Sequence, residues 1–215
     1  PEVAPQHAAF VVPLPDYHRR CLAFMMSVER GDHGSAGRWH DESYSDEERR
    51  HRVAMPPVRS WPVTGGWLAN PIGANENAIC FALIAANNSP HPQLQQADAT
   101  EGTTPPDVPV LKLTVVCANN TLVSTWQTEA ESLVPGVRCA QYYAGSKKAE
   151  TLKRLANDEL DLLITSHHTR LPPELQQPLR VHRLIIDESE WFEPGPYSKY
   201  KDIGLIRQRF RPSHI

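Results

Sequence analysis

The chain has 215 residues, of which 22% are charged, and its formal net charge is −3. A chain of this length buries a full hydrophobic core, and a single α/β domain is the expected class. The slightly acidic balance excludes an overall basic surface for nucleic acid. The longest apolar run, from Ala78 to Ala86, is far shorter than the roughly 20 residues that span a bilayer. The sequence therefore predicts no membrane span.

The four cysteines, Cys21, Cys80, Cys117 and Cys139, form no Cys-x-x-Cys pair, and three of them lie inside apolar runs. This pattern indicates reduced, buried thiols in an intracellular protein. No charged-then-apolar leader opens the chain, so secretion is not indicated. The first residue is Pro1 and not methionine, and we expect the chain to be an excerpt of a longer protein.

The first part of the chain, residues 1–64, is expected to contain one helix and a polar insertion. From Leu14 to Val28 apolar residues recur at helical spacing, with Phe24 alongside, and Gly31 is a plausible stop. Residues 31–60 are polar and charged, which favours an insertion outside the core. In the second part, residues 65–215, the segment 88–109 is rich in Pro, Asn, Gln and Thr and predicts a flexible loop.

The second part otherwise alternates between strand and helix patterns. The patterns predict a short strand ending at Trp67 and Leu68, a buried helix over 77–86, strands over 111–117, 137–143, 160–165 and 181–186, and helices over 121–133 and 147–156. Asn119 or Asn120 is a candidate cap for the helix over 121–133, and Trp126 on that helix is expected in the core and not as a base-stacking residue. This alternation predicts an α/β fold with a central, mostly parallel sheet and helices on both faces.

Two segments carry residues suited to phosphate chemistry. The stretch NPIGANEN (70–77) has the shape of a phosphate-binding turn before a helix, and Asp187 and Glu188 follow the last predicted strand. In parallel sheets ligands bind beyond the carboxyl ends of the strands, where both segments are expected. There Asp187 can hold Mg²⁺ and Glu188 can polarise an attacking water. An acidic pair after a strand is by itself typical of a solvated loop, but its order relative to the turn is that of phosphate-loop ATPases.

Five segments in chain order resemble motifs of the Swi/Snf-type helicase-like ATPases of helicase superfamily two. PLPDYHRRCLAFMMSVERG (13–31) is similar to the opening helix of that family, and GGWLANPIGANEN (65–77) is similar to its phosphate loop. VVCANNTLVSTWQTEA (115–130) resembles its Val-x-Cys-Pro segment with the following Trp and Glu. DLLITSHHTR (161–170) and VHRLIIDESEWF (181–192) resemble its Asp-Val-x-Leu-Thr-Thr-Tyr segment and its Asp-Glu-Ala-His strand. The long insertion after the first helix resembles the repair-type branch.

The resemblance implies a single RecA-like P-loop NTPase lobe, the first of two, in a nuclear protein that uses ATP and Mg²⁺ to move along duplex DNA. In the family a second lobe supplies arginines needed for hydrolysis, and we expect that lobe to be absent from this chain. The implied roles are a metal ligand, a catalytic acid, four phosphate-loop positions and an adenine-reading position. The residues at these positions are Asp187 for the metal, Glu188 for catalysis, Gly73, Asn75, Glu76 and Asn77 in the loop, and His18 at the adenine.

The loop departs from the family pattern at the positions that bind phosphate. Glu76 stands where the family has lysine, Asn77 where it has threonine and Asn75 where it has glycine; Glu190 replaces the last histidine of the acidic motif. A unit charge pair at 4 Å is worth about 4 kcal/mol at an effective dielectric constant near 20, whereas micromolar binding totals about 8 kcal/mol. We therefore expect weak Mg-ATP binding and little or no hydrolysis.

The same loop residues also suit a purely structural turn. Glu76 in the first turn of a helix is favourable with the helix dipole, and Asn75 is a competent cap. Three hypotheses therefore remain open. The chain is a residual ATPase lobe, a non-catalytic DNA- or protein-binding module (a pseudo-ATPase), or the product of a decaying gene fragment.

Overall fold

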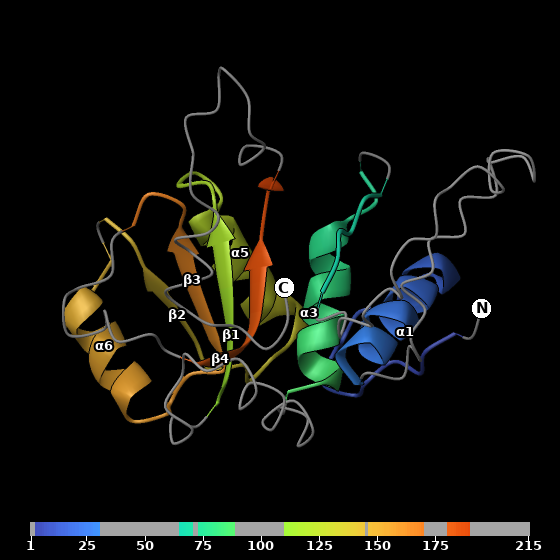
Figure 1. Ribbon diagram of the computed structural model, residues 1–215, viewed down its shortest axis with the longest axis horizontal. Coiled ribbons are helices and arrows are strands. Elements are labelled where there is room, and N and C mark those ends of the chain that lie inside the picture. The colour runs from blue at the N-terminus through green and yellow to red at the C-terminus, as the bar shows by residue number, and fades with distance from the viewer. Residues whose placement is uncertain are drawn as a thin grey trace, which may run out of the picture.

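The computed structural model describes residues 3–30, 65–70, 73–88, 110–144, 146–169 and 180–189. Its four strands form one parallel sheet in the order β2-β3-β1-β4 (Figure 1). The strands are β1 (Leu111–Ala118), β2 (Cys139–Tyr142), β3 (Leu162–Ser166) and β4 (Val181–Ile186). The helices are α1 (Asp16–Arg30), α3 (Glu76–Ala86), α5 (Val123–Leu133) and α6 (Lys148–Ala156). The predicted α/β fold with a parallel sheet is confirmed.

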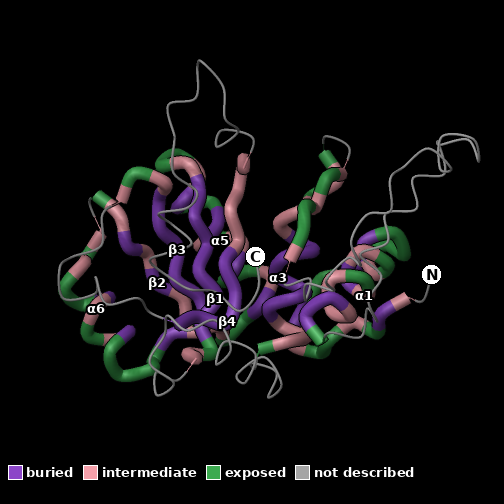
Figure 2. Tube along the Cα trace, in the orientation of Figure 1, coloured by how far each residue is buried: buried purple, intermediate pink, exposed green. Residues whose placement is uncertain are grey.

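Successive strand residues point to opposite sides of the sheet, so buried apolar side chains lie on both faces. Helices cover both of these faces. On one face Val116 and Ile164 belong to a hydrophobic cluster that includes residues of α1, α3 and α5. On the other face Val115 and Leu184 pack in a second cluster with Leu155 of α6. Figure 2 shows the buried residues concentrated in the strands and in α3.

The helix α3 is apolar on all sides, as its sequence predicted, and its residues from Ala78 to Ile84 are all buried. It lies between α1 and α5 and contacts both. The predicted stripe of the first helix is confirmed in part, since Leu14 and Val28 are buried and Cys21 and Met25 are half-buried. Leu22, which was not predicted, is fully buried, and Phe24 is 61% exposed. A helix that packs against a single partner helix buries only one narrow stripe of its surface. Phe24 therefore remains exposed on the outer side.

The cap predicted for the helix over 121–133 is wrong. The helix α5 begins at Val123 with Leu122 at the N-cap and no side-chain cap. The carbonyl of Asn119 instead accepts a hydrogen bond from the backbone N–H of Leu122 at 2.9 Å, and its side-chain oxygen contacts the N–H of Thr121 at 3.4 Å. The side chain of Asn119 therefore supports a turn before the helix, which is the competing use of asparagine.

The short strand predicted to end at Trp67 and Leu68 is also wrong, because residues 65–70 form no strand. Trp67 is 73% exposed, whereas Leu68 packs against the hydrophobic cluster of α1 and α3. With Gly65 and Gly66 at its start, this segment has a high entropic cost of ordering and only one apolar side chain to bury. The predicted insertion at 31–60 and residues 89–109 of the predicted loop lie outside the described residues.

Across the described ranges, no helix combines the length and apolar character needed to cross a membrane.

Candidate functional site

The turn before α3 and the acids after β4 lie at the same edge of the sheet. In Figure 1 the strands β1 and β4 end at the upper side, and α3 begins at that side and runs downward. Gly73 and Asn75 precede α3, and Asp187 and Glu188 follow β4. The carboxyl edge therefore holds both segments that the sequence singled out.

The turn has a left-handed backbone at two positions. Gly73 has φ 85° and Asn75 has φ 57° and ψ 58°. Asn75 occupies the N-cap of α3 but makes no side-chain cap hydrogen bond, so its expected capping role is wrong. Asparagine is one of the few residues with a side chain that tolerates this conformation. Glu76 lies in the first helical turn, as expected, where the dipole favours its carboxylate.

His18 of α1 lies directly against this turn. Its imidazole Nε2 is 2.5 Å from the carbonyl oxygen of Ala74. A carbonyl only accepts, so Nε2 carries the proton and, in the neutral ring, Nδ1 is left as an acceptor. The side chain is buried, and Nδ1 has no hydrogen-bond partner within the described part of the chain. The structure thus brings the predicted adenine position and the predicted phosphate loop together.

Asn77, where the resemblance implies a threonine, points to a neighbouring helix. Its side-chain amide donates a hydrogen bond of 2.9 Å to Oε2 of Glu129 on α5. Glu129 thereby brings a carboxylate to Asn77 in the first turn of α3, one position after Glu76 in the chain. The beginning of α3 is accordingly more acidic than the loop sequence alone indicates.

Asp187 is fixed at the end of β4 by two hydrogen bonds. Its backbone N–H donates to the carbonyl of Cys117 at 2.9 Å, and its Oδ2 accepts from Trp126 Nε1 at 2.7 Å. Trp126 is 2% exposed and meets the ring of Phe81 edge-on, at 5.2 Å between centroids. The expectation that Trp126 belongs to the core is confirmed. Its bond to Asp187 was not predicted, although a buried indole N–H requires a partner.

Glu188 and His167 are two further polar groups at this edge. Glu188 has φ 50°, and its Oε2 is buried with no partner among the described residues. Strained residues of this kind concentrate at functional sites. The imidazole of His167 contacts the carbonyl of Cys117 at 3.1 Å. Burial lowers the pKa of His167, whereas its backbone hydrogen bonds, including one with Asp187, raise it. The net shift of the pKa is downward, so the ring is held neutral.

The acids fit Mg²⁺ better than the turn fits a triphosphate. In the described ranges no three His, Cys, Asp or Glu side chains come together as a metal cluster. Mg²⁺, however, is commonly held by one or two carboxylates together with waters and substrate phosphates. The unpartnered oxygen of Glu188 and the carboxylate of Asp187 have that chemistry. Glu76, an acid in the first turn of α3, does not fit the phosphates.

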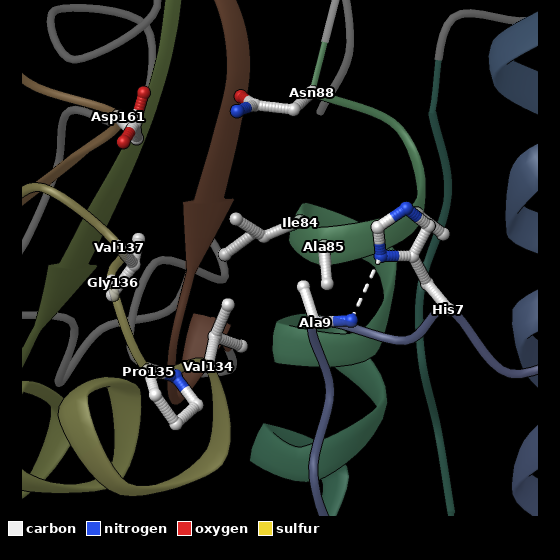
Figure 3. Close-up of a pocket in the computed structure, with 11 residues that line it drawn as sticks. His7, Ala9, Ile84, Ala85, Asn88, Val134, Pro135, Gly136, Val137 and Asp161 are labelled. Atoms are coloured by element: carbon white, nitrogen blue, oxygen red, sulfur yellow. Dashed lines mark hydrogen bonds between the residues drawn. The ribbon is translucent and has the colours of Figure 1, made fainter.

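A cavity of about 410 Å³ lies at the opposite edge of the sheet (Figure 3). Its lining includes His7, Asn88 just after α3, the loop from Val134 to Val137, and Asp161 just before β3. None of the residues singled out from the sequence lines it. Asp161 is bound by Arg138 through a 2.7 Å ion pair, which ties the starts of β2 and β3 together.

No protein-family model matches this sequence, and no curated protein matches it. We therefore infer function from the motifs and from the geometry of the carboxyl edge.

Proposed function

We propose that the chain is the ATP-binding lobe of a Swi/Snf-type DNA-dependent ATPase with a degenerate phosphate loop. Such a lobe binds Mg-ATP weakly and hydrolyses little or none of it alone. One observation carries the proposal. The turn before α3 and the acids after β4, which are distant in sequence, lie at the carboxyl edge of one parallel sheet, where nucleotides bind in such folds.

The residues at this edge indicate which features of a nucleotide site are retained and which are lost. Asp187 and Glu188 offer oxygen ligands to Mg²⁺, which would neutralise phosphate charge when bound. The turn keeps its left-handed residues at the start of a helix, the position that favours anions. Glu76 lies in the first turn of this helix and Glu129 binds the side chain of Asn77 next to it in the chain, and both acids oppose an anion at the helix start.

A second candidate is a non-catalytic module that retains the fold to bind duplex DNA or a protein. The hydrogen bond from Asn77 to Glu129 favours it, because a loop position that serves metal binding in the family here joins two helices. Titrating the chain with duplex DNA at several salt concentrations separates this candidate from a fragment without function. A phosphate-binding surface gives an affinity that falls steeply with salt.

The proposal is tested by repairing the loop. Asn75→Gly, Glu76→Lys and Asn77→Thr together should bind ADP at least about tenfold more tightly than the parent, because the charge change alone is worth roughly 1–4 kcal/mol. Glu76→Lys should supply most of the gain. The pair Asn75→Gly and Glu76→Lys is measured with and without Asn77→Thr, since the Asn77 amide also binds Glu129.

Glu150→Lys is the matched control for the repair. Glu150 is an exposed acid in the first turn of α6, so this variant reverses the same charge at another helix start. It should leave ADP binding unchanged. A folded triple variant that binds ADP no better than the parent would show that the turn has lost the phosphate-binding geometry, and the proposal would fail.

A further inference from the structure

Two side chains of α5 reach the two halves of the candidate site. Trp126 donates to Asp187 after β4, and Glu129 accepts from Asn77 at the start of α3. The two residues are three positions apart, which places them on one side of the helix and about 4.5 Å apart along its axis. A single rigid turn of α5 therefore contacts both the acids and the loop.

We propose that Trp126 is the positioning residue for Asp187, and that α5 holds the acids and the loop in register. This inference rests on the proposed function, since it assigns Trp126 a role in presenting a metal-binding carboxylate. A ligand carboxylate that is hydrogen-bonded from behind keeps one orientation and binds a metal more tightly. The N–H···O bond of 2.7 Å has the short length of a hydrogen bond to a charged acceptor.

The surroundings of Trp126 leave its indole little freedom. The side chain is 2% exposed, and its ring meets Phe81 of α3 at an interplanar angle of 60°. The backbone of Asp187 is tied to β1 through the carbonyl of Cys117. The carboxylate is thus held from its own backbone and from an immobile donor, and Oδ1 is the oxygen that the Trp126 bond does not occupy.

A packing role and a positioning role make different demands on Trp126. Packing against Phe81 needs an aromatic ring, whereas positioning Asp187 needs the indole N–H. Trp126→Phe keeps a ring and removes the donor, so it separates the two roles. Tyr142→Phe is the matched control, because it removes one polar group from a buried aromatic residue on the opposite face of the sheet.

The first measurement uses the full chain without the loop repair and without nucleotide. With ¹⁵N-labelled tryptophan, the indole N–H resonance of Trp126 is assigned by its loss in Trp126→Phe. Asp187→Asn removes the charge of the acceptor and should shift that resonance, while the resonance of exposed Trp67 stays in place. An unshifted Trp126 resonance in folded Asp187→Asn would overturn the inference.

The second measurement compares ADP affinity with Mg²⁺ and with a chelator in the loop-repaired triple variant. Adding Trp126→Phe should reduce the gain in affinity from Mg²⁺ by about tenfold, the usual effect of losing a group that orients a metal ligand. The affinity in chelator should not change. A merely structural role would lower both affinities together, and Tyr142→Phe should alter neither.

The outcomes separate this inference from the proposed function. If the repaired chain binds Mg-ADP and Trp126→Phe leaves the Mg²⁺ effect intact, the positioning role is overturned while the function stands. If the repaired chain binds no nucleotide, the proposed function fails. The indole resonance then decides whether Trp126 fixes Asp187.

Discussion

Asn75 combines a left-handed backbone with the start of the most buried helix of the described chain. A residue with a Cβ is disfavoured in this conformation by roughly 1–2 kcal/mol, and asparagine less so. Asn75→Ala should therefore lower the free energy of unfolding by about 1 kcal/mol, whereas Asn75→Gly should not lower it. Denaturant titration measures both.

Asn120→Ala is the control for this prediction. Asn120 is exposed, lies in a turn and does not have a positive φ, so its replacement should leave stability nearly unchanged. Equal stabilities for the parent and Asn75→Ala would mean that the left-handed turn does not form.

His167 should make stability depend on pH. Because burial lowers its pKa below the ordinary value of 6.5 in the folded chain, the unfolded chain binds the proton first as the pH falls. The free energy of unfolding should therefore decrease below about pH 6.5, and the decrease should level off once the folded imidazole is also protonated.

His167→Gln keeps a donor for the carbonyl of Cys117 and should remove this part of the pH dependence in denaturant titrations between pH 4 and 8, roughly the range that brackets histidine titration. His168→Gln changes the exposed neighbour, whose charge contributes least to lowering the pKa of His167, and should leave most of the decrease in place. A profile that is the same for all three chains would contradict the prediction.

At the scale of elements, a buried ion pair joins the end of α1 to the middle of β4. Glu29 and Arg183 bind through two hydrogen bonds, one of them 2.7 Å long between Arg183 Nη2 and Glu29 Oε2, with both side chains at most 5% exposed. Arg183 also donates to Thr114 of β1 and to the carbonyl of Asn87 after α3. One guanidinium thus links α1, α3 and two strands.

Breaking this pair should be far more damaging than removing it. Arg183→Met leaves the buried Glu29 carboxylate without its cation, although the amide of Asn87 still donates to it, and should lower the free energy of unfolding by about 3–5 kcal/mol. Combining it with Glu29→Met should recover part of the loss. Denaturant titration of the two variants and the parent tests this expectation.

Arg138→Met is the comparison for the buried pair. It breaks the ion pair with Asp161, in which the arginine side chain is 48% exposed, and should lower the free energy of unfolding by at most about 1 kcal/mol. If Arg183→Met were no more destabilising than Arg138→Met, the buried link between α1 and β4 would not exist.

The sequence predicted the elements whose apolar pattern was continuous, and it failed where a few polar residues decided the structure. The strands 111–117 and 181–186 and the buried helix over 77–86 were found within two residues of their ends. The cap of α5 and the segment 65–70 were wrong, because turn and cap residues have competing uses and two glycines weaken a short strand.

The candidate site was predictable only in part for the same reason. The order of motifs indicated that the turn and the acids share one edge. No pattern in the sequence links Trp126 to Asp187 or Asn77 to Glu129, since these contacts join residues more than 50 positions apart. The polar contacts of a buried tryptophan depend on which strand end lies next to its helix.

At the scale of the whole molecule, the parallel sheet places both polar segments at its carboxyl edge and the cavity at its amino edge. We propose that the fold retains the position of a nucleotide site and that Glu76 prevents tight binding there. A charge reversal at this position removes the attraction of a cation for phosphate and adds repulsion. The free energy lost is a large share of the roughly 8 kcal/mol of micromolar binding.

Calorimetric titration of the full chain with Mg-ATP measures the effect of Glu76 on binding. We predict no binding tighter than about millimolar, which corresponds to about 4 kcal/mol. A dissociation constant in the micromolar range would contradict the account, because it would mean that the loop binds phosphate despite Glu76.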